Sequence, residues 1–110
     1  MFNRQRLRAD ETKFQDLIAS PTDLAADDLV LPANGRLALS VDGAVGQGDI
    51  SIAFKDRTIT TPDLEADTYH HLGWFEVGST FTITCSTAVN LKVYMVTMIG
   101  QFREIGNGAF

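Results

Sequence analysis

The fold of this chain is decided by one stretch, Ser79-Thr-Phe-Thr-Ile-Thr-Cys-Ser-Thr-Ala-Val-Asn-Leu-Lys-Val-Tyr-Met-Val-Thr-Met-Ile99. In its first half, apolar side chains alternate with threonine and serine. A period of two places the apolar set on one face of a strand and the hydroxyls on the other. The side chains expected to point inward are Phe81, Ile83 and Cys85. This half predicts a half-buried antiparallel strand.

The second half of the stretch predicts a neighbouring strand of a different kind. Its inward phase is held by Leu91, Val93 and Met95. Its outward phase is apolar as well, with Tyr94, Val96 and Met98. A strand that is apolar on both faces is covered on both sides. We expect the second cover to come from another part of the chain or from a neighbouring subunit.

The remaining strands are predicted from the same period of two and from turn residues. They cover residues 29–31, 36–42, 49–55, 58–60 and 68–77. The last of these has no single apolar face, and a bulge at Gly73 accounts for the break. About seven short strands at turn spacing predict a mainly β chain, an antiparallel β-sandwich or jelly-roll-like fold.

Three regions of the chain are expected. Residues 1–28 hold a basic arm, a short helix at 10–19 and an acidic linker, and Ser20-Pro21 ends the helix. Residues 29–99 form the β-sandwich domain. Residues 100–110 form a C-terminal tail that Gly100, Gly106 and Gly108 make easy to bend. The sandwich therefore carries extended arms at both ends.

The length and charge of the chain limit the classes of protein to which it can belong. A chain of 110 residues with one cysteine forms one domain without disulfide staples. Neither a signal peptide nor a membrane span is expected, because no apolar run approaches the ~18 residues of a span. The net charge is −5, yet the only charged residues among the first eight are arginines. A basic arm therefore precedes an acidic body, which argues against nucleic acid as the main partner.

Residue patterns for catalysis or metal binding are missing from the sequence. His70 and His71 are adjacent on a strand, so they point to opposite faces, and neither a third histidine nor a second cysteine is present to complete a zinc site. Cys85 shares a buried phase, which a reactive thiolate would not. The glycine-rich residues 43–48 lack the Gly-Lys-Ser/Thr of a phosphate loop and predict a hairpin. We expect a protein that is not an enzyme, with no catalytic residues, no metal and no cofactor.

Aromatic residues near the bulged strand offer an alternative ligand face. Tyr69 and Trp74, with Phe75 beside them, could stack on a sugar ring, since flat aromatic faces bind the apolar side of a pyranose. Aromatic residues around a bulge also occur in cores and subunit interfaces. A carbohydrate-binding β-sandwich module that uses Tyr69 and Trp74 is the alternative function.

Several segments resemble small β-sandwich structural proteins of tailed bacteriophages. They are Leu29-Val-Leu-Pro-Ala-Asn-Gly35, the glycine-rich hairpin at 43–48, Ala66-Asp-Thr-Tyr-His-His71, Gly78-Ser-Thr-Phe-Thr-Ile83 and Leu91-Lys-Val-Tyr94. The resemblance covers residues 29–97 and carries over no binding residue. It implies a virion component, made in the host cytoplasm, that decorates or cements the capsid or joins head and tail.

Apolar anchors at both ends of the chain favour assembly as the function. We expect a symmetric homo-oligomer, a trimer, whose tails dock on the doubly apolar strand of adjacent subunits, together with contacts to a major capsid protein or another virion protein. The expected contact residues are Phe2, Arg4, Arg6, Leu7, Arg8, Tyr94, Val96, Met98, Phe102, Ile105 and Phe110.

Overall fold

The computed structural model describes residues 21–96 and 100–110 of the chain. Nine strands lie in these residues, and no helix does. They are β1 (Thr22–Asp23), β2 (Leu29–Val30), β3 (Gly35–Val41), β4 (Ile50–Phe54), β5 (Thr58–Thr60), β6 (His70–Phe75), β7 (Thr80–Cys85), β8 (Asn90–Val96) and β9 (Phe102–Ala109). The chain is therefore mainly β, as its alternating pattern predicts.

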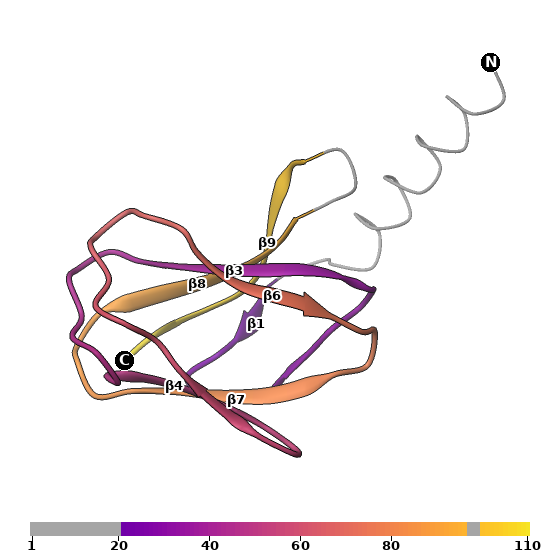
Figure 1. Cartoon of the computed structure of the whole chain (residues 1–110), viewed down its shortest axis with the longest axis horizontal. Coiled ribbons are helices and arrows are strands. Elements are labelled where there is room, and N and C mark those ends of the chain that lie inside the picture. Colours follow the sequence, from indigo (N-terminus) through magenta and orange to yellow (C-terminus); the bar gives the residue numbers. More distant parts are fainter. Residues whose placement is uncertain (1–20, 97–99) are drawn as a thin grey trace, which may run out of the picture.

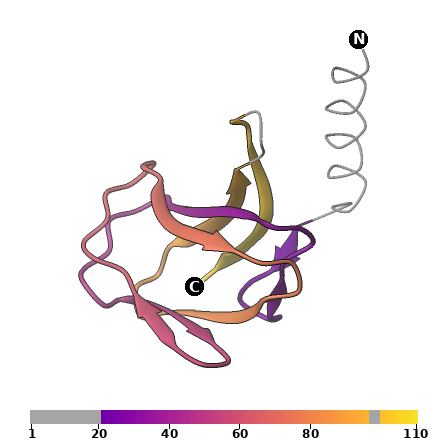
Figure 2. The same ribbon diagram turned by 45° about the vertical axis from the view of Figure 1, so that its right-hand side comes forward.

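The strands form two layers, as Figure 1 shows, with β3, β6 and β8 in the upper layer and β4 and β7 in the lower. One sheet has five strands in the order β1-β9-β8-β3-β6, and the other has four in the order β2-β7-β4-β5. All pairs are antiparallel except β1 with β9. In Figure 2 the β4–β5 hairpin, in magenta, projects from the lower layer. The two packed sheets confirm the prediction of a sandwich.

The core lies between the two sheets and follows the predicted phases. The five-stranded sheet contributes Leu37, Leu39, Val41, Leu91, Val93 and Met95, and the four-stranded sheet contributes Ile50, Ile52, Phe81 and Ile83. The rings of Phe54 on β4 and Phe75 on β6 stack with centroids 4.9 Å apart and join the layers at one edge. Period-two alternation is therefore sufficient to assign the inner faces of β3, β4, β7 and β8.

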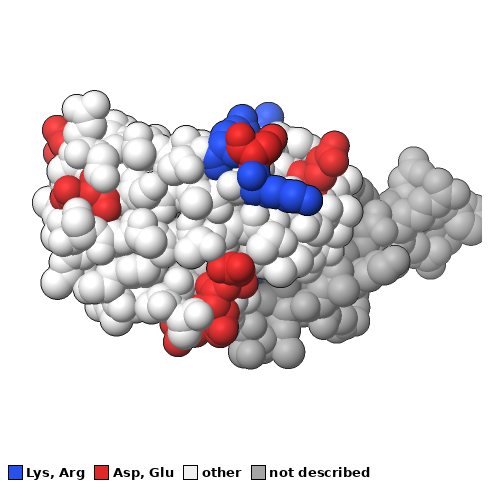
Figure 3. Space-filling model, turned by 90° about the horizontal axis from the view of Figure 1, so that it is seen from below, with Lys and Arg blue, Asp and Glu red and all other residues white. Residues whose placement is uncertain are grey.

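The outer face of the four-stranded sheet is a hydroxyl surface. Thr82 and Thr84 pair with Ala53 and Ser51, and β5 adds Thr58 and Thr60. Figure 3 looks at the molecule from this side and shows a wide area without charged residues, beside clusters of basic and acidic groups. Threonine suits this position because it combines a β-branched side chain with a group that water can solvate.

A bulge interrupts β6 where the sequence predicts one. Gly73 pairs with Leu37, but the next pair is His71 with Ala38, so Leu72 is the extra residue on β6. Gly73 has φ of 107°, a left-handed backbone conformation that a side chain would strain. The bulge turns Leu72 toward the core, where it packs half-buried. This explains why β6 has no regular apolar face in the sequence.

The C-terminal segment is a strand of the sandwich, so the expectation of a free tail is wrong. β9 pairs with β8 along its whole length, and Phe110 packs against the core. Ile105 sits at a bulge opposite Val93 and Tyr94 and is only 2% exposed. Ile105 and Phe110 are thus buried within their own subunit, because pairing with the unpaired side of β8 satisfies the backbone of both segments.

Two glycines of this segment make space for packing. A Cβ atom on Gly106 would lie 2.8 Å from Leu24 Cδ2, and one on Gly108 would lie 2.8 Å from the backbone nitrogen of Ala25. Leu24 is 2% exposed and belongs to the core. The predicted acidic linker therefore contributes strand β1 and a core residue. These two additions, β1 and β9, raise the strand count from the expected seven to nine.

Three predictions lie outside the described residues. The helix at 10–19, the basic arm at 1–8 and Met98 fall in residues 1–20 and 97–99. They remain predictions.

Candidate functional site: a groove on the five-stranded sheet

A groove of about 730 Å³ lies on the five-stranded sheet. It crosses the outer face, the side turned away from the other sheet, from β1 over β9 and β8 to β3 and the loop before β6. Its polar and aromatic lining consists of Asp23, Ser40, Asp42, Asp67, Tyr69, Asn90, Lys92, Tyr94 and Asn107. The groove is therefore built from four strands and one loop that are distant in the sequence.

Strand register explains why polar side chains meet in this groove. Ser40 pairs with Lys92, Lys92 pairs with Asn107, and Asn107 pairs with Asp23. Paired residues in neighbouring strands point to the same face, so these four side chains form one row across the sheet. The inward phase of the same strands fills the core. The alternation of side chains along these strands thus produces both the apolar core on one face and the polar row on the other.

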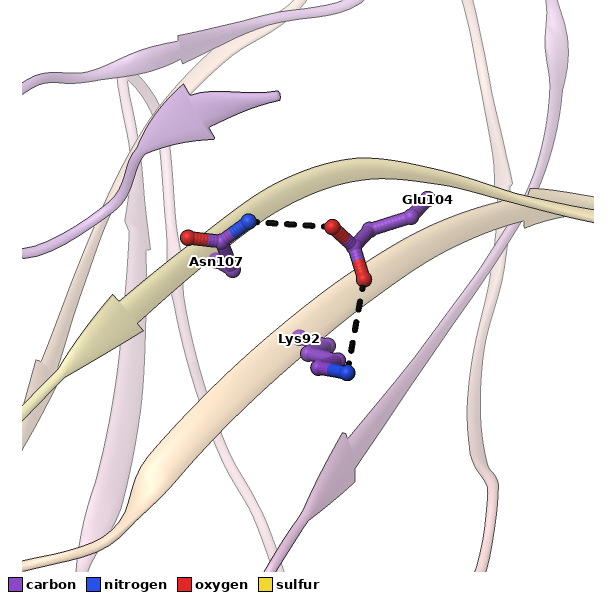
Figure 4. A network of polar contacts seen from close by, with 3 residues as sticks. All are labelled: Lys92, Glu104 and Asn107. Atoms are coloured by element: carbon purple, nitrogen blue, oxygen red, sulfur yellow. Dashed lines mark hydrogen bonds and ion pairs between the residues drawn. The ribbon is translucent and has the colours of Figure 1, made fainter. Parts of the chain in front are cut away.

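A polar network holds two members of the row in place, as Figure 4 shows. The Lys92 ammonium lies 3.7 Å from one Glu104 carboxylate oxygen, and the Asn107 side-chain amide donates to the other at 3.0 Å. Lys92 comes from β8, and the other two residues come from β9. Glu104 is mostly shielded from solvent, with 30% of its side chain exposed. It orients both neighbours and offsets the charge of Lys92.

Asp42 and Asn90 form a second fixed pair at one end of the groove. The backbone N–H of Asn90 donates to Asp42 Oδ1 at 2.8 Å, and its side-chain amide donates to Oδ2 at 2.7 Å. These bonds, first the backbone one and then the side-chain one, hold the pKa of Asp42 below its ordinary value of 3.8. Asp42 is therefore an anion and an acceptor at neutral pH.

The loop before β6 closes the groove and contains a strained residue. Asp67 has φ of 61°, in the left-handed region that aspartate tolerates better than most residues. Its backbone N–H donates to the carbonyl of Val41 at 2.8 Å, which ties the loop to the end of β3. Tyr69 follows two residues later. The strained turn thus places the tyrosine over the sheet.

Two aromatic rings, Tyr69 and Tyr94, line one side of the groove, and Phe102 packs against them from outside the lining; we call the three rings the aromatic cluster. The ring centroids of Tyr69 and Tyr94 lie 5.3 Å apart at an interplanar angle of 81°, and those of Tyr69 and Phe102 lie 4.5 Å apart. Both Tyr94 and Phe102 point outward from the sheet. The cluster therefore supplies, from the same chain, part of the second cover that the doubly apolar strand requires.

A different surface, the apolar end of the sandwich, begins at Phe102 of this cluster. Among the described residues, four of the five exposed large hydrophobic side chains lie there: Val30, Trp74, Val77 and Phe102. Trp74, Arg36, Val96 and Phe102 form one row across the outer face of the five-stranded sheet, in which Arg36 and Val96 lie between Trp74 and Phe102. Val30 pairs with Thr80 at the start of β7, so it lies at the same end of the sandwich but on the outer face of the four-stranded sheet. Trp74 is 63% exposed and Val77 58%.

The predicted ligand pair, Tyr69 and Trp74, does not form one platform. Tyr69 lines the groove, whereas Trp74 belongs to the apolar end, roughly 15 Å further along the strand. Phe75 points into the core and is 6% exposed. Of the predicted assembly residues, Phe102 lies at the apolar end and Val96 is half-buried beside it, while Tyr94 lines the groove.

Residues considered for catalysis lie apart. Cys85 belongs to the four-stranded sheet and donates its thiol to the carbonyl of Thr87 at 3.3 Å, while both histidines belong to the five-stranded sheet. Asp49, like Asp42, has a lowered pKa. This pKa is held below 3.8 by hydrogen bonds, first from the Thr87 hydroxyl and then from the Gly46 N–H and the Ser86 hydroxyl. In the part of the chain that the structure describes, no group of three or more metal-ligating side chains gathers.

Sequence reasoning missed most of the groove. The sequence pattern places Asp23 in a linker and Asn107 in a tail, and nothing in it distinguishes Ser40 or Lys92 from other polar residues on strands. The available signal is the outward phase of residues 40–42 and 90–94, in which polar and aromatic side chains alternate with the core. That signal becomes a site only when the strand order is known.

Comparison of the chain with known proteins gave no match among family models, curated proteins or solved structures. Within residues 21–96 and 100–110, no helix has the length and apolar character to cross a membrane.

Proposed function

We propose that this protein is a non-enzymatic structural protein of a bacteriophage virion, which stabilises or decorates the capsid or joins head and tail components. The observation that carries the proposal is the apolar end, where Trp74, Val77 and Phe102 are exposed at one end of the five-stranded sheet. Exposed large hydrophobic groups at one place mark a protein interface, and tryptophan is among the residues most enriched in binding hot spots.

The resemblance to tailed-phage structural proteins supplies the virion part of the proposal. The segments that carry it include the turn at Gly78 to Thr80, which lies directly beside Val77 at the apolar end. The basic arm with Phe2 and Leu7 adds a second attachment point through its arginines. β1 runs parallel to β9, so the chain enters the sandwich from the side of the apolar end.

Self-association through the apolar end replaces the exchange of tails. Ile105 and Phe110 are already used within the subunit, so they are not free to dock on a neighbour. Trp74, Val77 and Phe102 remain available. A closed ring, with a trimer as our proposal, would bury these side chains around its axis.

The test compares Trp74→Ser with Tyr69→Ser. Both residues are exposed aromatics, but Trp74 lies at the apolar end, whereas Tyr69 lines the groove and reaches that end only through its ring contact with Phe102. We expect light scattering to give the mass of an oligomer for the wild type and for Tyr69→Ser, and that of a monomer for Trp74→Ser. Loss of a tryptophan hot spot weakens association by about 2 kcal/mol or more.

A wild type that is monomeric at micromolar concentration, or a Trp74→Ser variant with unchanged mass, contradicts self-association at this surface. The virion assignment has its own test in the flanking genes. We expect them to encode capsid, portal or terminase proteins.

A further inference from the structure

We propose that the groove on the five-stranded sheet binds a neutral oligosaccharide. The site is distinct from the apolar end, and it moves the sugar-binding hypothesis from Trp74 to residues that only the fold brings together. Its central residues are Tyr69, Tyr94, Ser40, Lys92, Asn107 and Asp42.

The groove has the extent of an oligosaccharide. From β1 to β3 it crosses four adjacent strands, which corresponds to three spacings of about 4.8 Å, or roughly 14 Å. The volume of about 730 Å³ falls in the range of small-ligand sites. A single metal ion or phosphate would leave most of this space filled with water. An elongated ligand of a few sugar units fills it.

The functional groups match a ligand that is rich in hydroxyls. A sugar hydroxyl both donates and accepts, so it needs acceptors and donors side by side. Asp42 supplies carboxylate oxygens that retain lone pairs beyond those bound by Asn90. Lys92 and the amide of Asn107 supply donors from the neighbouring strands. A purely apolar ligand would leave the remaining lone pairs and N–H groups of these side chains without hydrogen bonds on binding.

The aromatic cluster supplies the apolar half of the recognition. Tyr69 is 52% exposed, although its ring is fixed against Tyr94 and Phe102. A ring that its neighbours already fix, and that is still accessible, can stack on the C–H face of a pyranose and loses little further side-chain freedom on binding. An aromatic wall beside a polar row therefore suits a sugar, which has one apolar face and a polar rim.

Charge selects a neutral sugar over an acidic one. Three aspartates, Asp23, Asp42 and Asp67, line the groove, and its one lysine is paired with Glu104. A uronate or sialate carboxylate would be repelled by this negative field.

The polar groups of the groove are also oriented before binding, by the Glu104 network, the Asp42–Asn90 pair and the bond from Asp67 to β3. Preorganisation of this kind reduces the entropy lost on binding.

The test begins with an array of neutral and acidic oligosaccharides probed with the full-length chain. The best neutral oligosaccharide is then titrated into the isotope-labelled protein. We expect the backbone amide signals of residues 40–42, 67–69, 90–94 and 107–109 to shift. We expect Tyr69→Ala to weaken binding at least about tenfold, which corresponds to about 1.4 kcal/mol.

Two further variants keep the result decisive. Ser40→Tyr fills the centre of the groove from the outer face without touching the core, and it should abolish binding while the fold is retained. Trp74→Ala is the matched aromatic control and should bind the sugar as the wild type does. Failure of every neutral oligosaccharide to bind, preference for the acidic ones, or loss of binding in Trp74→Ala would each overturn the proposal. None of these outcomes bears on assembly through the apolar end.

Discussion

The groove and the apolar end border the same five-stranded sheet but differ in how their side chains are held. In the groove, Asp42 and Lys92 are already engaged by neighbours in the chain. At the apolar end, Trp74 and Val77 expose most of their surface to water. Preformed polar groups suit a small hydroxyl-bearing ligand, and exposed hydrophobic groups suit a protein partner. Neighbouring surfaces of one sheet are therefore suited to two different roles.

Strand β9 links the two surfaces, since it begins with Phe102 at the apolar end and carries Asn107 in the groove. Between them, Ile105 belongs to the core. Two regions that share one strand should be lost together when that strand is removed.

The largest expected effect is therefore deletion of residues 101–110. The deletion exposes the edge of β8, removes the partner of β1 and takes Ile105 and Phe110 from the core. We expect the chain to unfold, with loss of its β circular dichroism and of its cooperative melting transition. Retention of the β spectrum with only a change in oligomeric mass would falsify the assignment of β9 to the sandwich.

A smaller effect, confined to the groove side, is expected from Gly108→Val. Its Cβ atom would meet the backbone nitrogen of Ala25 at 2.8 Å, so the segment that follows β1 must move. Overpacking of this kind costs about 1–3 kcal/mol, which denaturant unfolding would measure. Displacement of β1 should also shift Asp23 out of the groove, while the amide signals around Trp74 stay unchanged.

Ala109→Val is the control for this substitution, because Ala109 is exposed and pairs with Asn90 on the outer face. We expect its stability to equal that of the wild type within about 0.5 kcal/mol. Equal stability of the Gly108 variant would show that the segment after β1 is not packed tightly on β9.

The smallest expected effect is a loss of stability in acid. Asp42 and Asp49 both lie at the end of the sandwich opposite Trp74, and hydrogen bonds lower the pKa of each below 3.8. A lowered folded-state pKa stabilises the fold fully above the unfolded-state pKa. That stability is lost as the pH falls through the folded-state value, so it should disappear below about pH 4.

Denaturation midpoints measured from about pH 5 to pH 2 should therefore decline. The decline should be shallower in Asp42→Asn and in Asp49→Asn than in the wild type or in Asp63→Asn, a control in an exposed loop. If the three variants share one pH profile, the two hydrogen-bonded aspartates are not the source of acid sensitivity.

The sequence alone determined the inner face of the long strands. Phe81, Ile83, Leu91, Val93 and Met95 are buried as their alternation predicts, because a period of two fixes which side chains share a face. The bulge at Gly73 was also predictable, since a glycine at a break in the apolar pattern of a strand is typical of a bulge. These features depend only on neighbours along the chain.

The tertiary structure decided which strands are neighbours, and that choice created both surfaces. Gly106 and Gly108 indicate flexibility when they are considered along the chain, but in the fold they make space for Leu24 and Ala25. Asp23, Ser40, Lys92 and Asn107 meet only because β1, β9, β8 and β3 lie side by side. Hydrogen bonds between strands join residues far apart in the sequence, and no local pattern specifies their order.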